Sequence, residues 1–158
     1  MKIKIIVIFM LMVLNVMCLD TLQAAHCRVF LLGGQSNMAG RASKLDLPIS
    51  PVNLQLPQDD VLFYYGSSLT TLRPGSGTDF GPEVSFGRTV ADAIPAETCA
   101  LIKHGTGGTS LYDDWDPVNG GTYSTFRGVV ANALSALTNA GHTYEIVGML
   151  WTQGERDA

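Results

Sequence analysis

The chain is poor in charged residues, and this shortage excludes one broad class of protein. Only 15% of its 158 residues are charged, and 10 Lys and Arg against 14 Asp and Glu give a net charge of −4. An acidic chain of this kind lacks the positive surface that a nucleic-acid-binding protein needs. The hydrophobic fraction of 46% excludes an intrinsically disordered chain. The length supports one ordinary domain.

Metal-binding and nucleotide-binding patterns are also missing. The three cysteines and three histidines do not follow a zinc-ligand spacing. The glycine-rich segments contain no G-x-G-x-x-G or G-K-[ST] motif, which are the patterns that hold phosphate groups. We therefore expect neither a metal ion nor another cofactor.

Residues 1–25 have the pattern of a secretory signal peptide. Lys2 and Lys4 precede an uncharged apolar run over residues 5–19, and the small residues Ala24 and Ala25 close the segment. The run is shorter than the roughly 20 residues of a membrane-spanning helix. We expect cleavage after Ala25, which leaves residues 26–158 as a soluble, secreted or periplasmic chain. An uncleaved membrane anchor is the alternative.

The remaining sequence predicts alternating strands and helices. Apolar runs that stop at glycines indicate strands over 27–34, 61–65, 99–103 and 146–151, and helical spacing indicates helices over 82–94 and 123–139. Residues 41–60 contain three prolines and no clear period, and we expect an irregular segment there, as for the Gly/Ser/Thr-rich stretch that ends at Gly81. This alternation predicts an α/β domain with a parallel sheet and helices on both faces.

Three of these strands run into glycine-rich polar turns, at 33–40, 105–108 and 153–155. Because ligands bind beyond the carboxyl ends of parallel strands, we expect the three turns to meet at one site. Cys27 lies nine residues before Ser36, and Cys99 lies nine before Gly108. If the two strands are neighbours, this spacing places the cysteines side by side, and we expect a disulfide between them.

Ser36, in the sequence GGQSNMAG, follows a buried strand directly. A serine at a tight strand-to-helix turn exposes its hydroxyl group, and the free backbone N–H groups of such a turn can stabilise an oxyanion. A glycine-rich loop whose serine only caps a helix is the structural alternative, and this segment alone does not decide between them.

Four segments together resemble the carbohydrate esterases of the sialate O-acetylesterase and acetylxylan esterase type, within the SGNH hydrolases. They are GQSNMAG (34–40), FGPEVSFGRTVAD (80–92), GGTSLYDDW (107–115) and WTQGERDA (151–158). The resemblance covers almost all of the chain after the signal. It implies a flavodoxin-like three-layer α/β/α sandwich and the removal of O-acetyl groups from sugars by a serine mechanism without a metal.

The same resemblance implies a role for individual residues. Ser36 matches the nucleophile that would carry the acetyl group. Its backbone N–H, one from Gly107 or Gly108, and the side-chain amide of Gln153 would form the oxyanion hole. Three further residues are expected to shape the site: Gln35, Asn37 and Glu155. Ordinary turn glycines, a loop amide and a solvated carboxylate are the structural alternatives, and we interpret Arg156 as a surface charge.

A neutral serine also requires a general base, which is normally a histidine held by a carboxylate. In the family, these residues follow the WxQGE block, whereas the sequence given ends at Ala158. We expect His26 at the cleavage region, His142 at the far edge of the sheet and His104 in the pocket wall or packed, with a substitute base as the alternative for His104. We therefore expect residues 26–158 to be the N-terminal part of a longer esterase that is inactive, or nearly so, as this fragment alone.

Tyr112 and Trp115 are expected to hold a sugar ring by stacking, beside Asp113 and Asp114. A structural loop with a half-buried tryptophan is the alternative. The substrate could be acetylated sialic acid, xylan or another acetylated glycan. A non-catalytic glycan-binding module on the same fold is the alternative function, and a phosphate-binding flavodoxin-like domain is disfavoured because the turns offer few basic residues.

Overall fold

The computed structural model describes residues 25–75 and 79–158, so the predicted signal peptide lies outside the described residues except for Ala25. The described elements follow in chain order: β1 (His26–Gly34), α2 (Ser36–Ala39), β2 (Ala42–Ser43), the 3-10 turn η1 (Lys44–Asp46), β3 (Gln58–Tyr65), β4 (Ser68–Leu72), β5 (Asp79–Phe80), α3 (Glu83–Ala93), β6 (Thr98–Gly105), α4 (Gly121–Asn139) and β7 (Thr143–Thr152). All six predicted elements are present within a few residues of their expected bounds.

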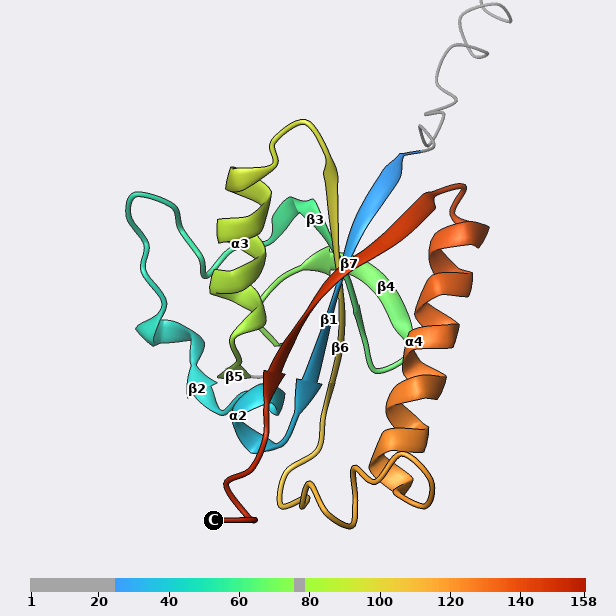
Figure 1. Cartoon of the computed structure of the whole chain (residues 1–158). Coiled ribbons are helices and arrows are strands. Elements are labelled where there is room, and N and C mark those ends of the chain that lie inside the picture. Colours follow the sequence, from blue (N-terminus) through green and yellow to red (C-terminus); the bar gives the residue numbers. More distant parts are fainter. Residues whose placement is uncertain (1–24, 76–78) are drawn as a thin grey trace, which may run out of the picture.

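The main sheet has the strand order β4-β3-β6-β1-β7. β3, β6, β1 and β7 are parallel, and β4 is antiparallel to β3. Figure 1 shows α3 on one face of this sheet and α4 on the other, which makes three layers. The predicted α/β architecture with a mostly parallel sheet is therefore confirmed. The order of the parallel strands differs in detail from that of flavodoxin, because β1 lies between the third and fourth of them rather than between the second and third.

Side-chain alternation along the central strands builds two separate cores. Leu32 and Leu101 face α3 and pack with Phe30 and Phe86, whose rings meet edge to face at 5.5 Å. On the other face, β1 and β6 pack against the apolar stripe of α4; this core includes Val29, Ala100, Ile102, Val130, Ala133 and Leu137. Both faces of the central strands are buried, which explains why their sequences are continuous apolar runs.

One strand of the main sheet was not predicted, and neither were the two-residue strands β2 and β5, which pair antiparallel in a separate small sheet. Residues 68–72, within the expected loop, form β4, which pairs back on β3 with Tyr65 opposite Ser68. The two residues between them make a tight hairpin turn in which Gly66 has a φ of +71°, a conformation that glycine adopts at little cost. The Ser/Thr-rich composition hid a short strand that contains β-prone threonine and leucine.

The predicted disulfide is wrong, and the strand register explains why. Cys27 pairs with Thr98, and Cys99 pairs with Arg28. Because successive side chains on a strand point to opposite faces, a shift of one residue sends Cys27 into the core under α4 and Cys99 into the core under α3. Both are buried free thiols, and burial raises the pKa of Cys99 to about 11.

Candidate active site

The three glycine-rich turns meet beyond the carboxyl ends of β1, β6 and β7, as predicted. Figure 1 shows these strand ends together with α2 and the C-terminus of the chain at the lower edge of the sheet. Gln35 donates its backbone N–H to the carbonyl of Thr152 at 3.0 Å. A Cβ at Gly105 would lie 2.5 Å from the backbone nitrogen of Ala39, and one at Gly107 would lie 3.7 Å from the Cβ of Ser36. Glycine at position 105 therefore lets the second turn approach α2 closely, whereas Gly107 contacts Ser36 at an ordinary van der Waals distance.

Ser36 is the first residue of α2 and is half-buried. Its Oγ makes no hydrogen bond to any residue in the described ranges. The backbone N–H groups of Ser36 and Gly107 also have no hydrogen-bond partner in the described part of the chain. The first N–H groups of a helix have no partner within the helix, so they remain available to an external acceptor. The hydroxyl of Ser36 and two free N–H donors therefore belong to residues that lie next to each other, since Gly107 contacts Ser36.

Glu155 fixes the two residues that flank Ser36. Its Oε2 accepts a short hydrogen bond from Nε2 of Gln35, and its Oε1 accepts one from Nδ2 of Asn37 at 2.5 Å. The hydrogen bond from Gln35 is the largest cause that lowers the pKa of Glu155, so the carboxylate stays ionised at neutral pH. This carboxylate contacts both neighbours of the serine, and the role of all three side chains in shaping the site stays a prediction.

Gln153 belongs to the last turn (153–155), and it contacts the chain directly after Gly108, which ends the second turn (105–108). Nε2 of Gln153 donates to the carbonyl of Thr109 at 2.9 Å, and its buried Oε1 has no hydrogen-bond partner among the residues that the structure describes. One N–H of this amide is thus engaged, and its contribution to an oxyanion hole stays a prediction. Of the two candidate glycines, Gly107 is the one against Ser36, whereas Gly108 adopts a φ of +73° with open space around its α-carbon.

Arg156 and Asp157 have contacts that sequence reasoning missed. Nη1 of Arg156 donates to the carbonyl of Gly108 at 2.5 Å and lies 3.7 Å from Oδ2 of Asp114. The carboxylate of Asp157 accepts the backbone N–H groups of Leu111 and Tyr112 at 2.8 to 3.3 Å. The sequence did contain a signal for these contacts, because a run of charged residues at 155–157 comes shortly after a strand that ends at the site. These two side chains hold the second turn in place.

Trp115 cannot stack on a sugar in this arrangement, so its predicted binding role is wrong. Only 4% of Trp115 is exposed, its Nε1 donates to Thr109 at 3.1 Å, and its ring meets that of Trp151 at 4.7 Å. The alternative of a structural tryptophan describes it better. Tyr112, by contrast, is 85% exposed and remains available to a ligand.

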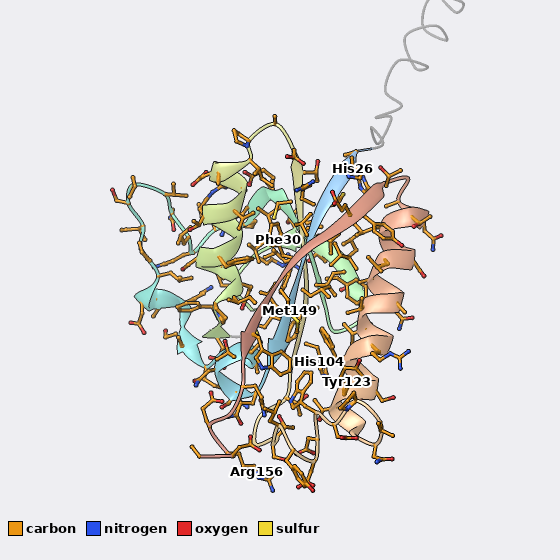
Figure 2. The ribbon with its side chains drawn as sticks, in the orientation of Figure 1. His26, Phe30, His104, Tyr123, Met149 and Arg156 are labelled. Atoms are coloured by element: carbon orange, nitrogen blue, oxygen red, sulfur yellow. The ribbon has the colours of Figure 1, made fainter. Side chains whose placement is uncertain are left out.

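His104 is packed rather than catalytic. Its ring lies against those of Trp115 and Phe126, on the α4 side of the sheet (Figure 2), and its Nε2 is 3.2 Å from the hydroxyl of Thr106. Burial lowers the pKa of His104, so it is neutral at pH 7. The other two histidines lie at the amino ends of the strands, where His26 contacts Thr143 and His142 accepts the N–H of Ala25. None of these three histidines, all of which lie in the described ranges, makes a hydrogen bond to Ser36.

Neither a metal-binding cluster nor a membrane-spanning helix is found in the part of the chain that the structure describes. Across residues 25–75 and 79–158, no three histidine, cysteine or acidic side chains gather in a way that could hold a metal ion. Within the same ranges, every helix is too short or too polar to cross a membrane.

The fold and the site together define an α/β protein with a serine-containing turn at the carboxyl edge of a mostly parallel sheet. The family model described as "carbohydrate esterase, sialic acid-specific acetylesterase" matches residues 26–158. The chain therefore belongs to this family of carbohydrate esterases, as the sequence motifs predicted.

Comparison with solved structures agrees with the fold. A protein from Arabidopsis thaliana, solved by X-ray crystallography, superposes with a TM-score of 0.63 at 22% sequence identity. The match covers 82% of this chain and 58% of that protein, so the chain spans little more than half of its length. No curated protein matches the chain.

Proposed function

We propose that the chain carries the nucleophile and oxyanion donors of a secreted serine esterase that removes O-acetyl groups from sugars. The observation that carries this proposal is the surroundings of Ser36. Its hydroxyl makes no hydrogen bond within the described ranges, the N–H groups of Ser36 and Gly107 have no partner there, and Glu155 holds the residues on both sides of Ser36. Membership in a carbohydrate esterase family supports the same reaction class.

In the proposed reaction, Oγ of Ser36 attacks the acetyl carbonyl carbon and gives its proton to a general base. The N–H groups of Ser36 and Gly107 stabilise the negative oxygen of the tetrahedral intermediate, and Gln153 is the third candidate donor. The sugar hydroxyl leaves with the proton returned by the base, and the acetyl group remains on Oγ. A water molecule then hydrolyses this ester and releases acetate.

The general base is proposed to come from outside the residues described here, in the whole protein or from a partner chain. This follows from the position of the three histidines, none of which makes a hydrogen bond to Ser36 in the described ranges. We therefore expect residues 1–158 alone to release acetate slowly or not at all. We further propose that residues 1–25 direct the protein to the secretory route, and that its partner is an acetylated sialic acid or xylan-type glycan.

The experiment compares the whole secreted protein with its Ser36→Ala variant on acetylated sugars. We expect acetate release to fall by about 10³-fold or more in the variant, and the wild-type protein to acquire one acetyl group on the peptide that contains Ser36. Ser124→Ala, at an exposed position of α4, is the matched control and should leave both signals unchanged. Binding of the acetylated glycan without acetate release would instead support a non-catalytic glycan-binding module.

A further inference from the structure

Lys103, near the end of β6, is a buried cation beside the turn that carries Ser36. Only 1% of its side chain is exposed, and lysine is almost never buried to this extent unless it is paired. Its Nζ donates to Oε2 of Glu83 at 2.6 Å and to the backbone carbonyl of Ala39 at 2.9 Å, and it lies 5.0 Å from the centre of the Tyr65 ring. The three N–H donors of the ammonium group therefore have partners on three different elements, α3, α2 and β3.

Glu83 connects the same ion pair to the segment that precedes α3. Glu83 is the first residue of α3, and its second oxygen, Oε1, accepts the backbone N–H of Gly81 at 3.1 Å. A Cβ at Gly81 would lie 2.9 Å from the carbonyl oxygen of Met38, so this segment packs directly against α2. Figure 1 shows α2 beside β5, which comes directly before Gly81. The segment before α3 and the end of α2 are therefore held around one buried ion pair.

The helix α2, which begins with Ser36, is too short to hold its own shape. It has four residues, and two backbone hydrogen bonds close it: from Ala39 to the carbonyl of Gln35 at 2.8 Å and from Gly40 to the carbonyl of Ser36 at 2.9 Å. Helices shorter than about 12 residues are only marginally stable in water without tertiary contacts. The position of Ser36 therefore depends on side chains from other elements, and Lys103 contacts the last residue of α2.

We propose that Lys103 is a positioning residue, which holds the carboxyl end of α2 so that Ser36 stays against Gly107. Glu155 contacts the residues on both sides of Ser36, so the two side chains hold the short helix from its two ends. A displacement of about 1 Å at a reacting group can slow a reaction by about a hundredfold. The inference rests on the proposed function for this consequence, because the position of Ser36 affects a rate only if Ser36 is the nucleophile.

The test uses the double variant Lys103→Met/Glu83→Gln of the whole secreted protein. The variant removes both charges together, so no unpaired charge remains in the core, while the carbonyl of Ala39 loses the donor that Lys103 provides. Arg88→Met is the matched control. It also removes a paired cation, but the ion-pair partners of Arg88 are Asp60 of β3 and Asp92 of α3, at 2.7 and 2.8 Å. The control therefore costs stability without removing the contact to α2.

Two measurements are compared, and urea unfolding gives the folded fraction by which each rate is corrected. Amide hydrogen exchange, followed by NMR, reports the opening of α2. In the double variant, exchange at Ala39 and Gly40 should become about tenfold or more faster relative to the core amides of β6, and it should not do so in Arg88→Met. In acetate release from an acetylated sugar, kcat should fall by about tenfold or more while KM stays within about twofold, because the buried Lys103 does not contact the sugar.

The outcomes separate this inference from the proposed function, because hydrogen exchange does not require Ser36 to react. Unchanged relative exchange at Ala39 and Gly40 overturns the inference, and so does a wild-type kcat in the double variant. Equal effects in the double variant and in Arg88→Met overturn it as well, since they would report stability alone. If the whole wild-type protein releases no acetate, the proposed function is contradicted, and the exchange measurement alone decides whether Lys103 holds α2.

Discussion

Replacing Glu83 by glutamine removes the negative charge of a buried ion pair that lies next to the turn carrying Ser36. The side chains of Lys103 and Glu83 are 1% and 5% exposed, and their charged atoms lie 2.6 Å apart. The amide of Glu83→Gln keeps an oxygen that can accept the backbone N–H of Gly81, as Glu83 does at 3.1 Å. With that oxygen turned toward Gly81, the amide nitrogen faces Nζ of Lys103 in place of Oε2, so the substitution removes both the counter-charge and a hydrogen-bond acceptor of the buried ammonium group.

The expected loss of stability follows from this burial. Removing one partner of a buried ion pair typically costs about 3–5 kcal/mol. Lys103 keeps its hydrogen bond to the carbonyl of Ala39, so we expect a loss near the lower end, about 3 kcal/mol. Equilibrium urea unfolding, followed by the fluorescence of Trp115 and Trp151, measures the change in the free energy of unfolding.

The pH dependence of the free energy of unfolding provides a second, independent test of this ion pair. Burial lowers the pKa of Lys103 from 10.5, while the charge and hydrogen bond of Glu83 oppose that shift. Without Glu83, the pKa of Lys103 falls further. In the window between this lowered pKa and 10.5, the unfolded chain binds more protons than the folded chain, so stability rises with pH. The deficit of Glu83→Gln should therefore shrink as the pH rises through the lowered pKa of Lys103 in the variant toward the pKa of Lys103 in the wild type.

Two controls complete this test. Glu97→Gln removes an exposed partner of Arg28, with side chains 34% and 43% exposed, and should cost at most about 1 kcal/mol. The double variant Lys103→Met/Glu83→Gln removes the unpaired charge and should recover part of the loss. The reasoning is refuted if Glu83→Gln is within about 1 kcal/mol of the wild type at neutral pH and its deficit does not change with pH.

Three further outcomes are expected. Glu155→Ala should slow acetyl transfer to the nucleophile in the whole protein by about ten- to a hundredfold, because the turn loses its positioning, with little change in unfolding free energy; an unchanged rate contradicts this role. Cys27 and Cys99 should react with a thiol reagent only after unfolding, and reduction should leave the mass of the native protein unchanged; rapid labelling of the native state argues against their burial. Gly105→Ala should cost about 1–3 kcal/mol, because its Cβ would lie 2.5 Å from a backbone nitrogen of α2, whereas Gly128→Ala has open space; equal melting temperatures would count against the close approach.

The sequence predicted the sheet and the meeting of the turns because both follow from local patterns. An apolar run such as that of β1 indicates a buried strand, and the carboxyl ends of parallel strands lie at one edge. The predicted disulfide failed because it needed the register between β1 and β6 to within one residue. Spacing from Cys27 and Cys99 to their turns does not define that register, since the turns differ in shape.

The role of Trp115 illustrates a second limit. An aromatic residue in a polar loop could face a ligand or fill a core, and composition is the same in both cases. Burial was decided by Trp151 and Phe126, which come from two other elements and pack against the indole.

The placement of the last turn depends on one extra residue in β7, at the edge of the described sheet. β7 pairs with β1 in parallel, but the register shifts between Val29 and Phe30, which leaves Val147 unpaired. Such a bulge reverses which face the following side chains occupy. Beyond it, Trp151 lies over Gly33, where a Cβ would meet its ring at 2.9 Å, and two residues later Gln153 reaches the carbonyl of Thr109. Without the extra residue, Trp151 and the residues that follow would face the opposite side, and the turn could not bring Glu155 to the neighbours of Ser36.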